Sequence, residues 1–555
     1  MRDYIRSDFA SDLIAGVVTA TLLIPQAMAY SQLAGLPPEI GLYASMLPPV
    51  LYALVGSSRT MAVGPVAVAS LMLAAALGAR WTPGSPEYLG GAVVVAGLVG
   101  VLLLLMGLAR LGVVANFLSH PVLSGFTNAA ALVILVSQLP PLFGIAVPRG
   151  SIDEVAAGLV GGFDGLHGVT TLLGLVAVGL LIGVSRFGSR LLQWLGLDPI
   201  RADVAVRAFP LVLVAAATGS VAAGLAGHGV AVAGVIPQGL PAVALPGLEP
   251  VLWLDLAGPA AAIALVSFVE SLSIARVLAA RRRQKVNADR ELLGLGLANA
   301  GAAFTGASPV CGGFSRSVVN FEAGARTQVA GVVTAVVIGL TALFLTPWFH
   351  DLPITVLAAI VVVSVTNLFD LHTLRLCWRY NRADALALIA TFVAVLSEGM
   401  ETGIAVGVVL SAVLFLWRTS RPHTAIVGRV GDTEHFRNVA RHAVTTYPGL
   451  LVIRIDESLY YANAQALEDL LLNEVADCEA VRHVVLICSA VNFIDTSALE
   501  TLENLIEELR EAGVTLHLAE VKGPVMDGLE RVSLLERLAP GRVFLSTHEA
   551  VHTLG

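Results

Sequence analysis

The chain has 555 residues, of which 56% are hydrophobic and only 13% are charged, and its formal net charge at pH 7 is -8. Its mean hydropathy is +0.80. Soluble globular proteins are typically about one quarter charged, so this composition excludes an ordinary soluble protein and indicates one that crosses a membrane many times.

Long apolar runs recur from about residue 12 to residue 417. The run "GGAVVVAGLVGVLLLLMGLA" is one example, and about 20 apolar residues suffice to cross the hydrocarbon core as a helix. We therefore predict a polytopic α-helical membrane protein with about fourteen spans. Their approximate positions are 13–33, 41–56, 63–79, 89–109, 117–138, 169–185, 205–225, 255–277, 291–306, 313–325, 328–348, 354–369, 384–397 and 402–418.

The basic residues predict the topology. If the N-terminus is cytoplasmic, the outer loops near 34–40, 139–168 and 226–254 contain a single arginine, Arg149. This asymmetry follows the positive-inside rule, so we expect a multi-pass protein of the cell inner (plasma) membrane with both its N-terminus and its C-terminal part in the cytoplasm. The basic residues of the inner loops are Arg59, Arg110, Arg186, Arg190, those of the stretch 276–290, Arg375, Arg379 and Arg382.

Two short apolar segments have an unusual start. "SSRTMAVGPVAVASL" (57–71) and "ASPVCGGFSRSVVNF" (307–321) both place Gly or Pro where a hydrophobic helix begins, at an offset of about 250 residues. Seven predicted spans separate the copies, so their orientations in the membrane must be opposite. Interrupted short segments in two inverted halves indicate a transporter's binding site at the bilayer midplane. The alternative is that both segments are loops that join ordinary helices.

Inverted orientation gives these two segments a chemical role. If both short helices begin near the bilayer centre, their N-termini face each other, and each N-terminus offers unpaired N–H groups and about half a positive charge. Such a pair forms an anion site. We expect Gly64, Gly312 and Gly313 to let a ligand approach the backbone closely.

Polar side chains near these segments fit an anion site. Ser315 and Ser317 can supply hydroxyl groups, and Arg316 adds positive potential. Gln26 and Tyr30 lie on the first span and can donate hydrogen bonds. Each of these residues has the alternative role of an ordinary polar contact between helices.

One acidic residue, Glu270, lies in the middle of the apolar segment "AIALVSFVESLSIA". An ionisable group at that position is costly and is a functional hypothesis by default. Burial and a nearby positive charge affect a carboxyl group in opposite directions, so Glu270 could take up a proton together with an anion. The alternative is a structural pair with Arg276 or Arg316.

After Arg421 the composition changes. "LLVIRID", "VRHVVLIC", "VTLHLAEV" and "RVFLS" read as short strands, and they alternate with helical stretches at about 462–476, 497–511 and 522–536. This alternation predicts a small α/β domain over 421–555, after a membrane domain over 1–420. We place the first repeat of the membrane domain at about 8–228 and the second at about 250–420.

The stretches that begin "LLIPQAMAYSQLAGLPPEIGLYASMLPPV" and "FLSHPVLSGFTNAAAL" closely resemble the SulP family of anion transporters, the sulfate permeases, and the resemblance runs from about residue 8 to residue 535. It implies fourteen helices in two inverted seven-helix repeats, a core and a gate domain, elevator-like movement, a homodimer and a cytoplasmic STAS domain. It also implies a substrate site between the third and tenth helices, with contributions from the first and eighth. Carried over to this chain, the site residues are Gln26, Tyr30, Gly64, Val66, Gly313, Phe314, Ser315, Arg316 and Glu270.

This chain differs from two groups of family members at positions that bear on the coupling ion. Sodium-coupled bicarbonate members of the family carry an Asp and a Thr around the ion site, whereas this chain has Glu270 and the triplet Gly313-Phe314-Ser315. The difference disfavours sodium and is more similar to proton-coupled bacterial members. The animal motor and channel-like members lack an acid at this position, so Glu270 also favours coupled transport.

The C-terminal domain resembles STAS domains of the anti-sigma-antagonist type. "VNFIDTSALETL" (491–502) matches the segment in which signalling relatives are phosphorylated, and Thr496 and Ser497 are the matching positions. An Asp-Thr-Ser sequence that opens a helix is equally a plain N-cap, and we favour the cap over phosphoregulation.

Enzymatic function is disfavoured. "GLGLANAG" is not a true dinucleotide-binding fingerprint, since Asn299 stands at the third glycine and no strand precedes it. The four cysteines, Cys311, Cys377, Cys478 and Cys488, show neither metal-ligand nor disulfide spacing. We therefore expect no catalytic residues, cofactor, metal or nucleic-acid partner.

The sequence thus predicts a secondary active transporter that moves a small anion, with sulfate as the first choice and protons as the coupling ion. C4-dicarboxylates such as fumarate, and bicarbonate, remain alternatives. An uncoupled anion exchanger or channel, a nucleobase transporter of the same architecture, and a membrane-tethered signalling protein are less favoured. The expected partners are the anion, protons, membrane lipid and a second copy of the chain.

Overall fold

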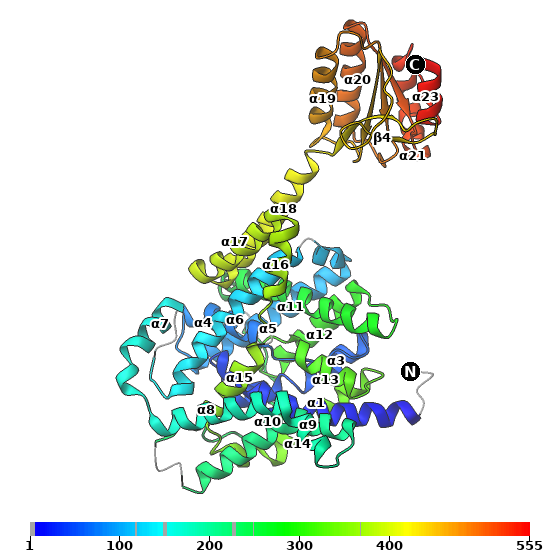
Figure 1. Ribbon diagram of the computed structural model, residues 1–555. Coiled ribbons are helices and arrows are strands. Elements are labelled where there is room, and N and C mark those ends of the chain that lie inside the picture. The colour runs from blue at the N-terminus through cyan, green and yellow to red at the C-terminus, as the bar shows by residue number, and fades with distance from the viewer. Residues whose placement is uncertain (1–5, 117–118, 148–151, 225–228, 248, 367) are drawn as a thin grey trace. The chain divides into compact units, whose positions relative to one another are not determined.

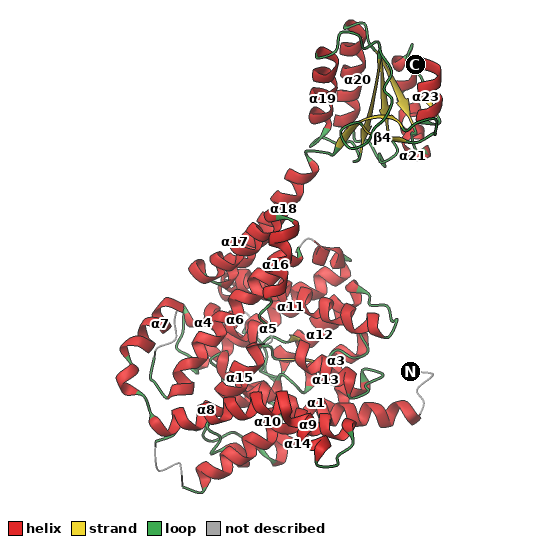
Figure 2. Cartoon of the chain, viewed as in Figure 1, coloured by secondary structure: helices red, strands yellow, loops and turns green. Residues whose placement is uncertain are grey.

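The computed structural model describes residues 6–116, 119–147, 152–224, 229–247, 249–366 and 368–555. Arg149, on which the predicted topology partly depends, lies outside these residues. The chain divides into two compact units, Met1–Ser411 and Ala412–Gly555. The first unit is helical and the second contains a sheet with helices on it (Figures 1 and 2).

Helices make up most of the first unit. Its described part contains eight helical stretches that are long and apolar enough to cross a membrane, and each of the fourteen predicted segments contains a helix, so the predicted helical membrane class is confirmed. The helices are α1 (Arg6–Leu33), α2 (Pro38–Tyr43), α3 (Leu47–Val55), α4 (Ala67–Gly78), α5 (Pro86–Leu108), α6 (His120–Phe143), α7 (Ile152–Gly161), α8 (Gly168–Gly183), α9 (Ser189–Trp194), α10 (Pro199–Ala222), α11 (Pro250–Arg281), α12 (Ala288–Phe304), α13 (Phe314–Glu322), α14 (Val329–Phe344), α15 (Ile354–Thr366), α16 (Leu371–Tyr380), α17 (Arg382–Glu398) and α18 (Met400–Thr419), the last of which continues into the second unit. Two short strands, β1 (Val63–Gly64) and β2 (Cys311–Gly312), lie among them.

The helix contacts repeat with their partners exchanged. Helix α1 packs against α13 and α14, while α11 packs against α4 and α5. In the same way α3 contacts α14 while α12 contacts α5, and α6 contacts α17 while α15 contacts α8. If α1 to α10 form one repeat and α11 to α18 the other, each of the contacts named above has a counterpart with the repeats interchanged. This pattern is the expected consequence of two inverted repeats related by a pseudo-two-fold axis.

Glycines allow several of these helices to cross closely. A Cβ on Gly41 would lie 2.0 Å from the carbonyl oxygen of Ala27, and one on Gly125 would lie 2.3 Å from that of Leu388. Small residues let membrane helices approach to backbone contact, where van der Waals packing provides the stability that the hydrophobic effect does not supply in lipid. These crossings fix α1 against α2 and α6 against α17.

The second unit contains a six-stranded sheet in the order β4-β3-β5-β6-β7-β8. Strands β5 to β8 pair in parallel, whereas β3 pairs antiparallel with both β4 and β5. The elements are β3 (Thr424–Arg429), β4 (Phe436–Asn438), β5 (Leu450–Ile455), α19 (Ala464–Ala476), β6 (His483–Ile487), α20 (Thr496–Glu511), β7 (Thr515–Ala519), α21 (Gly523–Arg531), α22 (Leu534–Leu538), β8 (Val543–Phe544) and α23 (Thr547–Leu554).

Alternation along the strands divides the core of this unit between the two faces of the sheet. Val484 and Leu486 pack in the cluster that includes α19 to α22, while Val485 and Ile487 pack in the cluster that includes α23. Successive side chains of a strand point to opposite faces, so a strand buried on both sides is apolar throughout. The four predicted strands and the α/β class are confirmed, and β3, β4 and α23 are additions that the sequence analysis did not contain.

Candidate anion site

The two segments with unusual starts meet in the structure. Strands β1 and β2 pair antiparallel, with Val63 opposite Gly312 and Gly64 opposite Cys311. All four residues are buried. Because each strand runs directly into a short helix, α4 or α13, the pairing places the beginnings of both helices at one crossing.

Neither helix start has a side-chain cap. Val66 and Gly313 are the N-cap residues of α4 and α13, and no side chain bonds to the amides of either first turn. The first intrahelical bonds run from the Ser70 amide to Val66 and from the Ser317 amide to Gly313. The three amides before each of these have no acceptor within their helix, so two clusters of N–H donors and two positive dipole ends converge.

Arg316 holds the crossing together. Its side chain is 1% exposed, and its three nitrogens donate to four carbonyl oxygens: Nε to Ala62 at 2.8 Å, Nη1 to Pro65 at 2.5 Å, and Nη2 to Gly64 and Cys311 at 2.7 Å each. A guanidinium has five N–H donors, and four of them bond the backbone of β1, of β2 and of the two residues that flank β1. The guanidinium of Arg316 therefore binds the backbone on both sides of the crossing.

The glycines at the crossing are required by packing within the protein. A Cβ on Gly312 would lie 2.3 Å from Sδ of Met61, and one on Gly313 would lie 2.7 Å from Cζ of Arg316. At Gly64 the nearest atom would be Oγ of Ser45 at 3.3 Å. Protein atoms therefore fill the Cβ directions of Gly312 and Gly313, and the close approach of a ligand to the backbone at these glycines stays a prediction.

The side chains on α13 differ in where they point. Phe314 is 51% exposed and Ser315 is also exposed, so both are accessible at the start of the helix. Ser317 was expected to offer its hydroxyl group to a ligand, but it is fully buried and its Oγ accepts the Ala62 amide at 3.0 Å. A helix turns 100° per residue, which places residues two apart on different faces.

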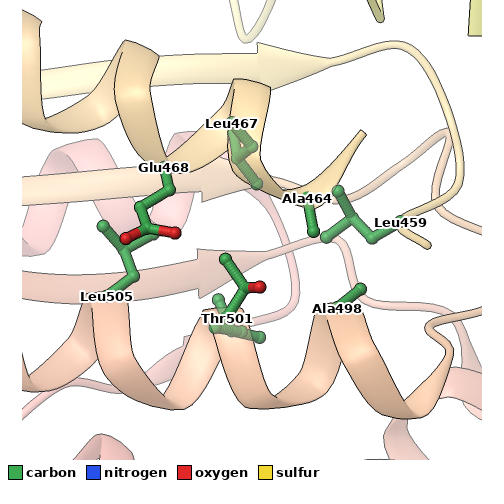
Figure 3. Close-up of a pocket in the computed structure, with 8 residues that line it drawn as sticks. Leu459, Ala464, Leu467, Glu468, Ala498, Thr501 and Leu505 are labelled. Atoms are coloured by element: carbon green, nitrogen blue, oxygen red, sulfur yellow. The ribbon is translucent and has the colours of Figure 1, made fainter. Parts of the chain in front are cut away.

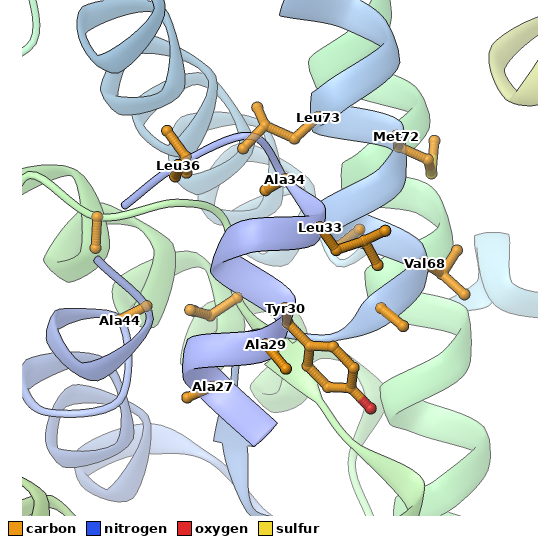
Figure 4. Close-up of a cluster of buried hydrophobic side chains, with 14 of the residues drawn as sticks. Ala27, Ala29, Tyr30, Leu33, Ala34, Leu36, Ala44, Val68, Met72 and Leu73 are labelled. Atoms are coloured by element: carbon orange, nitrogen blue, oxygen red, sulfur yellow. The ribbon is translucent and has the colours of Figure 1, made fainter. Parts of the chain in front are cut away.

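Helix α1 contributes two of the predicted residues. Nε2 of Gln26 donates to Oη of Tyr30 at 2.9 Å, and both side chains are buried. Figure 4 shows the ring of Tyr30 extending from α1 near the helix that carries Val68 and Met72, with Leu33 one turn further along. Contact of α1 with both α4 and α13 brings this pair to the crossing.

Helix α11 places Glu270 beside the crossing. The neighbouring residue Ser271 accepts the Gly312 amide with Oγ at 2.8 Å, which binds α11 directly to β2. Glu270 is half-buried and interacts electrostatically with Arg316, and Tyr30 interacts with both groups. Among the described residues, Glu270 forms no salt bridge with Arg316 or Arg276, and its structural pairing with either arginine stays an alternative.

Two further buried residues position the crossing, and the sequence analysis missed their role. Glu291 of α12 is fully buried, and it accepts hydrogen bonds from Oη of Tyr52 at 2.7 Å and from the amides of Ser57 and Ser58 at 2.8 and 2.9 Å. These bonds fix the segment that leads into β1. An acidic residue at the start of an apolar stretch was the available signal, but its partners lie more than 230 residues away.

Asn299 has the corresponding role for β2. Its Oδ1 accepts the Val310 amide and its Nδ2 donates to the Val310 carbonyl, both at 2.9 Å, immediately before β2 begins. Nδ2 also donates to Leu295 within α12 at 2.9 Å. In the sequence, Asn299 stands out only because it occupies the third position of an incomplete glycine motif.

A large cavity of about 1540 Å³ lies next to the α1 end of the site. Its lining includes Ala29 and Leu33 of α1 and Leu71 of α4, together with Val133 of α6 and Leu357 of α15. Ala29 directly precedes Tyr30 in α1, so the cavity approaches the predicted site within one helical turn.

In the second unit, Asp495 is the N-cap of α20. Its Oδ1 accepts the Ala498 amide at 2.8 Å and its Oδ2 accepts the Tyr461 amide at 2.9 Å. Thr496 and Ser497 are exposed in the first turn of the helix. The plain cap is therefore present, and regulation at Thr496 or Ser497 stays a prediction.

A crevice between α19 and α20 has a volume of only about 10 Å³, room for about one water molecule (Figure 3). It is lined mainly by aliphatic side chains, and Glu468 lies at its edge. Burial raises the pKa of Glu468, and the nearby carboxylates of Glu508 and Asp469 raise it further.

Within the described residues, no group of three or more His, Cys, Asp or Glu side chains could hold a metal ion.

Comparison with known proteins identifies the family. Residues 9–391 match the model of the sulfate permease family, and residues 441–550 match the STAS domain. The chain is 37% identical to "Probable sulfate transporter 4.2" of Arabidopsis thaliana, over 98% of this chain and 80% of that protein. It is 34% identical to "Probable sulfate transporter MT1781" of Mycobacterium tuberculosis (strain CDC 1551 / Oshkosh), over 99% and 96%.

Among solved structures, "The overall structure of SLC26A9" has a similar fold, with a TM-score of 0.89, 24% sequence identity, and coverage of 100% of this chain and 91% of that chain. The resemblance predicted from the sequence is confirmed by these matches, which extend over both units. The chain belongs to the sulfate permease family and carries a C-terminal STAS domain.

Proposed function

We propose that this protein is a secondary active transporter of a small anion, with sulfate as the first substrate. The observation that carries the proposal is the β1–β2 crossing, where two helix N-termini without side-chain caps converge. Such a site stabilises an anion through backbone amides and helix dipoles, and it needs no direct bond from a cationic side chain. Relatives named as sulfate transporters support this substrate.

The predicted site residues have separate roles in this proposal. The amides of the first turns of α4 and α13, which begin after Val66 and Gly313, bind the anion. The exposed hydroxyl of Ser315 and the paired Gln26 and Tyr30 complete the hydrogen bonding. Gly64 shapes the crossing, Arg316 supplies charge from behind it, and Phe314 covers the entrance.

Glu270 couples transport to protons in this proposal. It lies on the helix bonded to β2, in electrostatic contact with Arg316. An anion that enters the crossing brings negative charge close to this carboxyl group and favours its protonation. Proton uptake by Glu270 would then accompany anion binding and be reversed on release.

An elevator-like movement of a core domain (α1 to α5 and α11 to α14) against a gate domain (α6 to α10 and α15 to α18) would carry the site across the membrane. The large cavity is lined by both groups of helices, through Ala29 and Leu71 on one side and Val133 and Leu357 on the other. An ion pair joins Arg207 of α10 to Glu322 of α13, again linking the two groups. With the predicted topology, the cavity opens to the outside and the ion pair closes the cytoplasmic side.

We further propose, from the family resemblance and the arrangement of basic residues, a homodimer in the inner (plasma) membrane with the N-terminus and the STAS domain in the cytoplasm. The transport domain would comprise residues 1–420, with repeats at about 8–228 and 250–420, and the STAS domain residues 421–555.

Uptake of sulfate into proteoliposomes tests the substrate and the coupling together. The assay uses an imposed inward proton gradient in the absence of sodium, with ionophore-collapsed gradients as the control. Uptake that follows the gradient supports proton–sulfate symport. If the folded protein transports fumarate or bicarbonate but not sulfate, the anion site is retained and the proposed substrate is wrong. If uptake does not depend on the proton gradient, the proposed coupling is refuted.

A further inference from the structure

Helix α16 (Leu371–Tyr380) lies in the chain between the two apolar helices α15 and α17 and is itself amphipathic. Its buried residues, Thr373 and Cys377, are one turn apart, and the helix packs against α17 and α6. Its start is fixed, because Oδ1 of Asp370 accepts the Thr373 amide at 3.0 Å and Oδ1 of Asn128 accepts the Asp370 amide at 2.7 Å. The helix is therefore anchored to the first unit by one narrow face.

The opposite face combines arginines with large apolar side chains. At 100° per residue, Leu371, Arg375, Trp378 and Arg379 share the face turned away from Thr373. Leu371 is 56% exposed and Trp378 is 55% exposed, and both arginines are exposed. No ion pair among the residues that the structure describes involves these arginines.

We propose that this face of α16 binds the headgroups of anionic phospholipids in the leaflet that it faces, the cytoplasmic leaflet in the topology proposed above. Arg375 and Arg379 lie one turn, about 6 Å, apart along the helix, so their guanidinium groups can bond neighbouring phosphate oxygens. Leu371 and Trp378 lie beside Arg375 on this face and enter the boundary between headgroups and acyl chains, where Trp is enriched.

The arrangement requires more than the positive-inside rule. That rule needs basic residues in the loop, but it does not require two arginines to share one helix face with an exposed leucine and an exposed tryptophan, opposite the anchor. A helix that faced only water would expose a polar surface there. The site is independent of the β1–β2 crossing, so it can be tested whatever anion the protein transports.

The experiment titrates the purified full-length protein in neutral detergent with a fluorescent phosphatidylglycerol and follows its binding by fluorescence anisotropy. The test variant is Arg375→Gln/Arg379→Gln, and the matched control is Arg437→Gln/Arg441→Gln, which removes two exposed arginines from the second unit. Each arginine near an anionic lipid surface contributes about 1 kcal/mol. We therefore expect the test variant to bind about thirtyfold more weakly and the control to bind like the wild type.

Two competitors and one further variant distinguish the source of the phosphate and the role of the apolar residues. Unlabelled phosphatidylglycerol should displace the probe, whereas phosphatidylcholine and millimolar inorganic phosphate should not. Trp378→Ala should weaken binding without removing its salt dependence. Displacement by inorganic phosphate would overturn the lipid assignment, and so would wild-type affinity in the test variant. If the double variant does not elute as a single species on gel filtration, Arg375→Gln and Arg379→Gln are measured separately, with about a fivefold loss expected for each.

Discussion

Replacement of Arg316 by lysine separates two roles of this residue, as a source of positive charge and as a clamp on the backbone. Lysine keeps the charge, but its three donors originate from one nitrogen. The guanidinium of Arg316 bonds four carbonyl oxygens from three nitrogens, and these carbonyls belong to both strands of the crossing and to the residues that flank β1. A lysine at this position cannot reach all of them.

The cost follows from the number of lost hydrogen bonds. A bond from a charged donor contributes about 1.5–3 kcal/mol, so the loss of two of the four bonds destabilises the crossing by about 3–6 kcal/mol. The orphaned carbonyl oxygens are buried, which prevents water from replacing the arginine. We therefore expect Arg316→Lys to lower the thermal unfolding midpoint by several degrees and to raise KM for sulfate more than tenfold.

The assay combines thermal unfolding in detergent with initial uptake rates in proteoliposomes. Arg537→Lys is the matched control, since the Arg537 side chain is 56% exposed and its Nη1 pairs with Oε2 of Glu503 at 2.6 Å in the second unit. This control should remain close to the wild type in both measurements. Wild-type midpoint and KM in Arg316→Lys would refute the clamp and leave the charge as its contribution.

Three other predictions follow from the same geometry and from the second unit. Gly312→Ala places a Cβ 2.3 Å from Sδ of Met61, so it should cost about 1–3 kcal/mol and reduce uptake, and Met61→Ala in the same chain should restore much of the uptake; absence of any rescue would contradict the packing explanation. Glu270→Gln should abolish accumulation driven by a proton gradient while sulfate exchange continues, measured as counterflow in proteoliposomes; retained gradient-driven accumulation would exclude its coupling role. Burial, with smaller effects of His483 and Arg542, lowers the pKa of His517 from 6.5 to about 4. Protonation therefore favours the unfolded state, and stability present above pH 6.5 is lost towards pH 4, by about 3 kcal/mol in total. His517→Gln should make the stability of the second unit less dependent on pH. The measurement is urea unfolding of the full chain, with hydrogen exchange of the strands of the second unit as the readout. An unchanged pH profile in the variant would refute the role of His517.

The sequence by itself determined the membrane class, the helical segments and the α/β class of the second unit. Lipid offers no hydrogen bonds to the backbone, so an apolar run of about 20 residues has essentially one solution, the helix. Apolar strands that alternate with amphipathic helices are similarly restrictive, because a parallel sheet needs both faces covered. These patterns are local, and they were sufficient to identify the interrupted segments around Gly64 and Gly313.

Strands β1, β3 and β4 were beyond the reach of such patterns. A strand of two residues such as β1 has no periodicity, and it exists because β2 supplies its partner 248 residues later. Antiparallel pairing at the edge of a sheet likewise creates β3 and β4 from segments with weak local preference.

Only the tertiary structure decided what the polar residues do. Ser315 and Ser317 are equivalent in a sequence, yet one is exposed and the other accepts the Ala62 amide. Arg316 directs its donors to carbonyl oxygens, and Glu291 accepts amides from the opposite repeat. The physical reason is that a buried polar group must find a partner, and these partners lie more than 200 residues away, where no local pattern can indicate them.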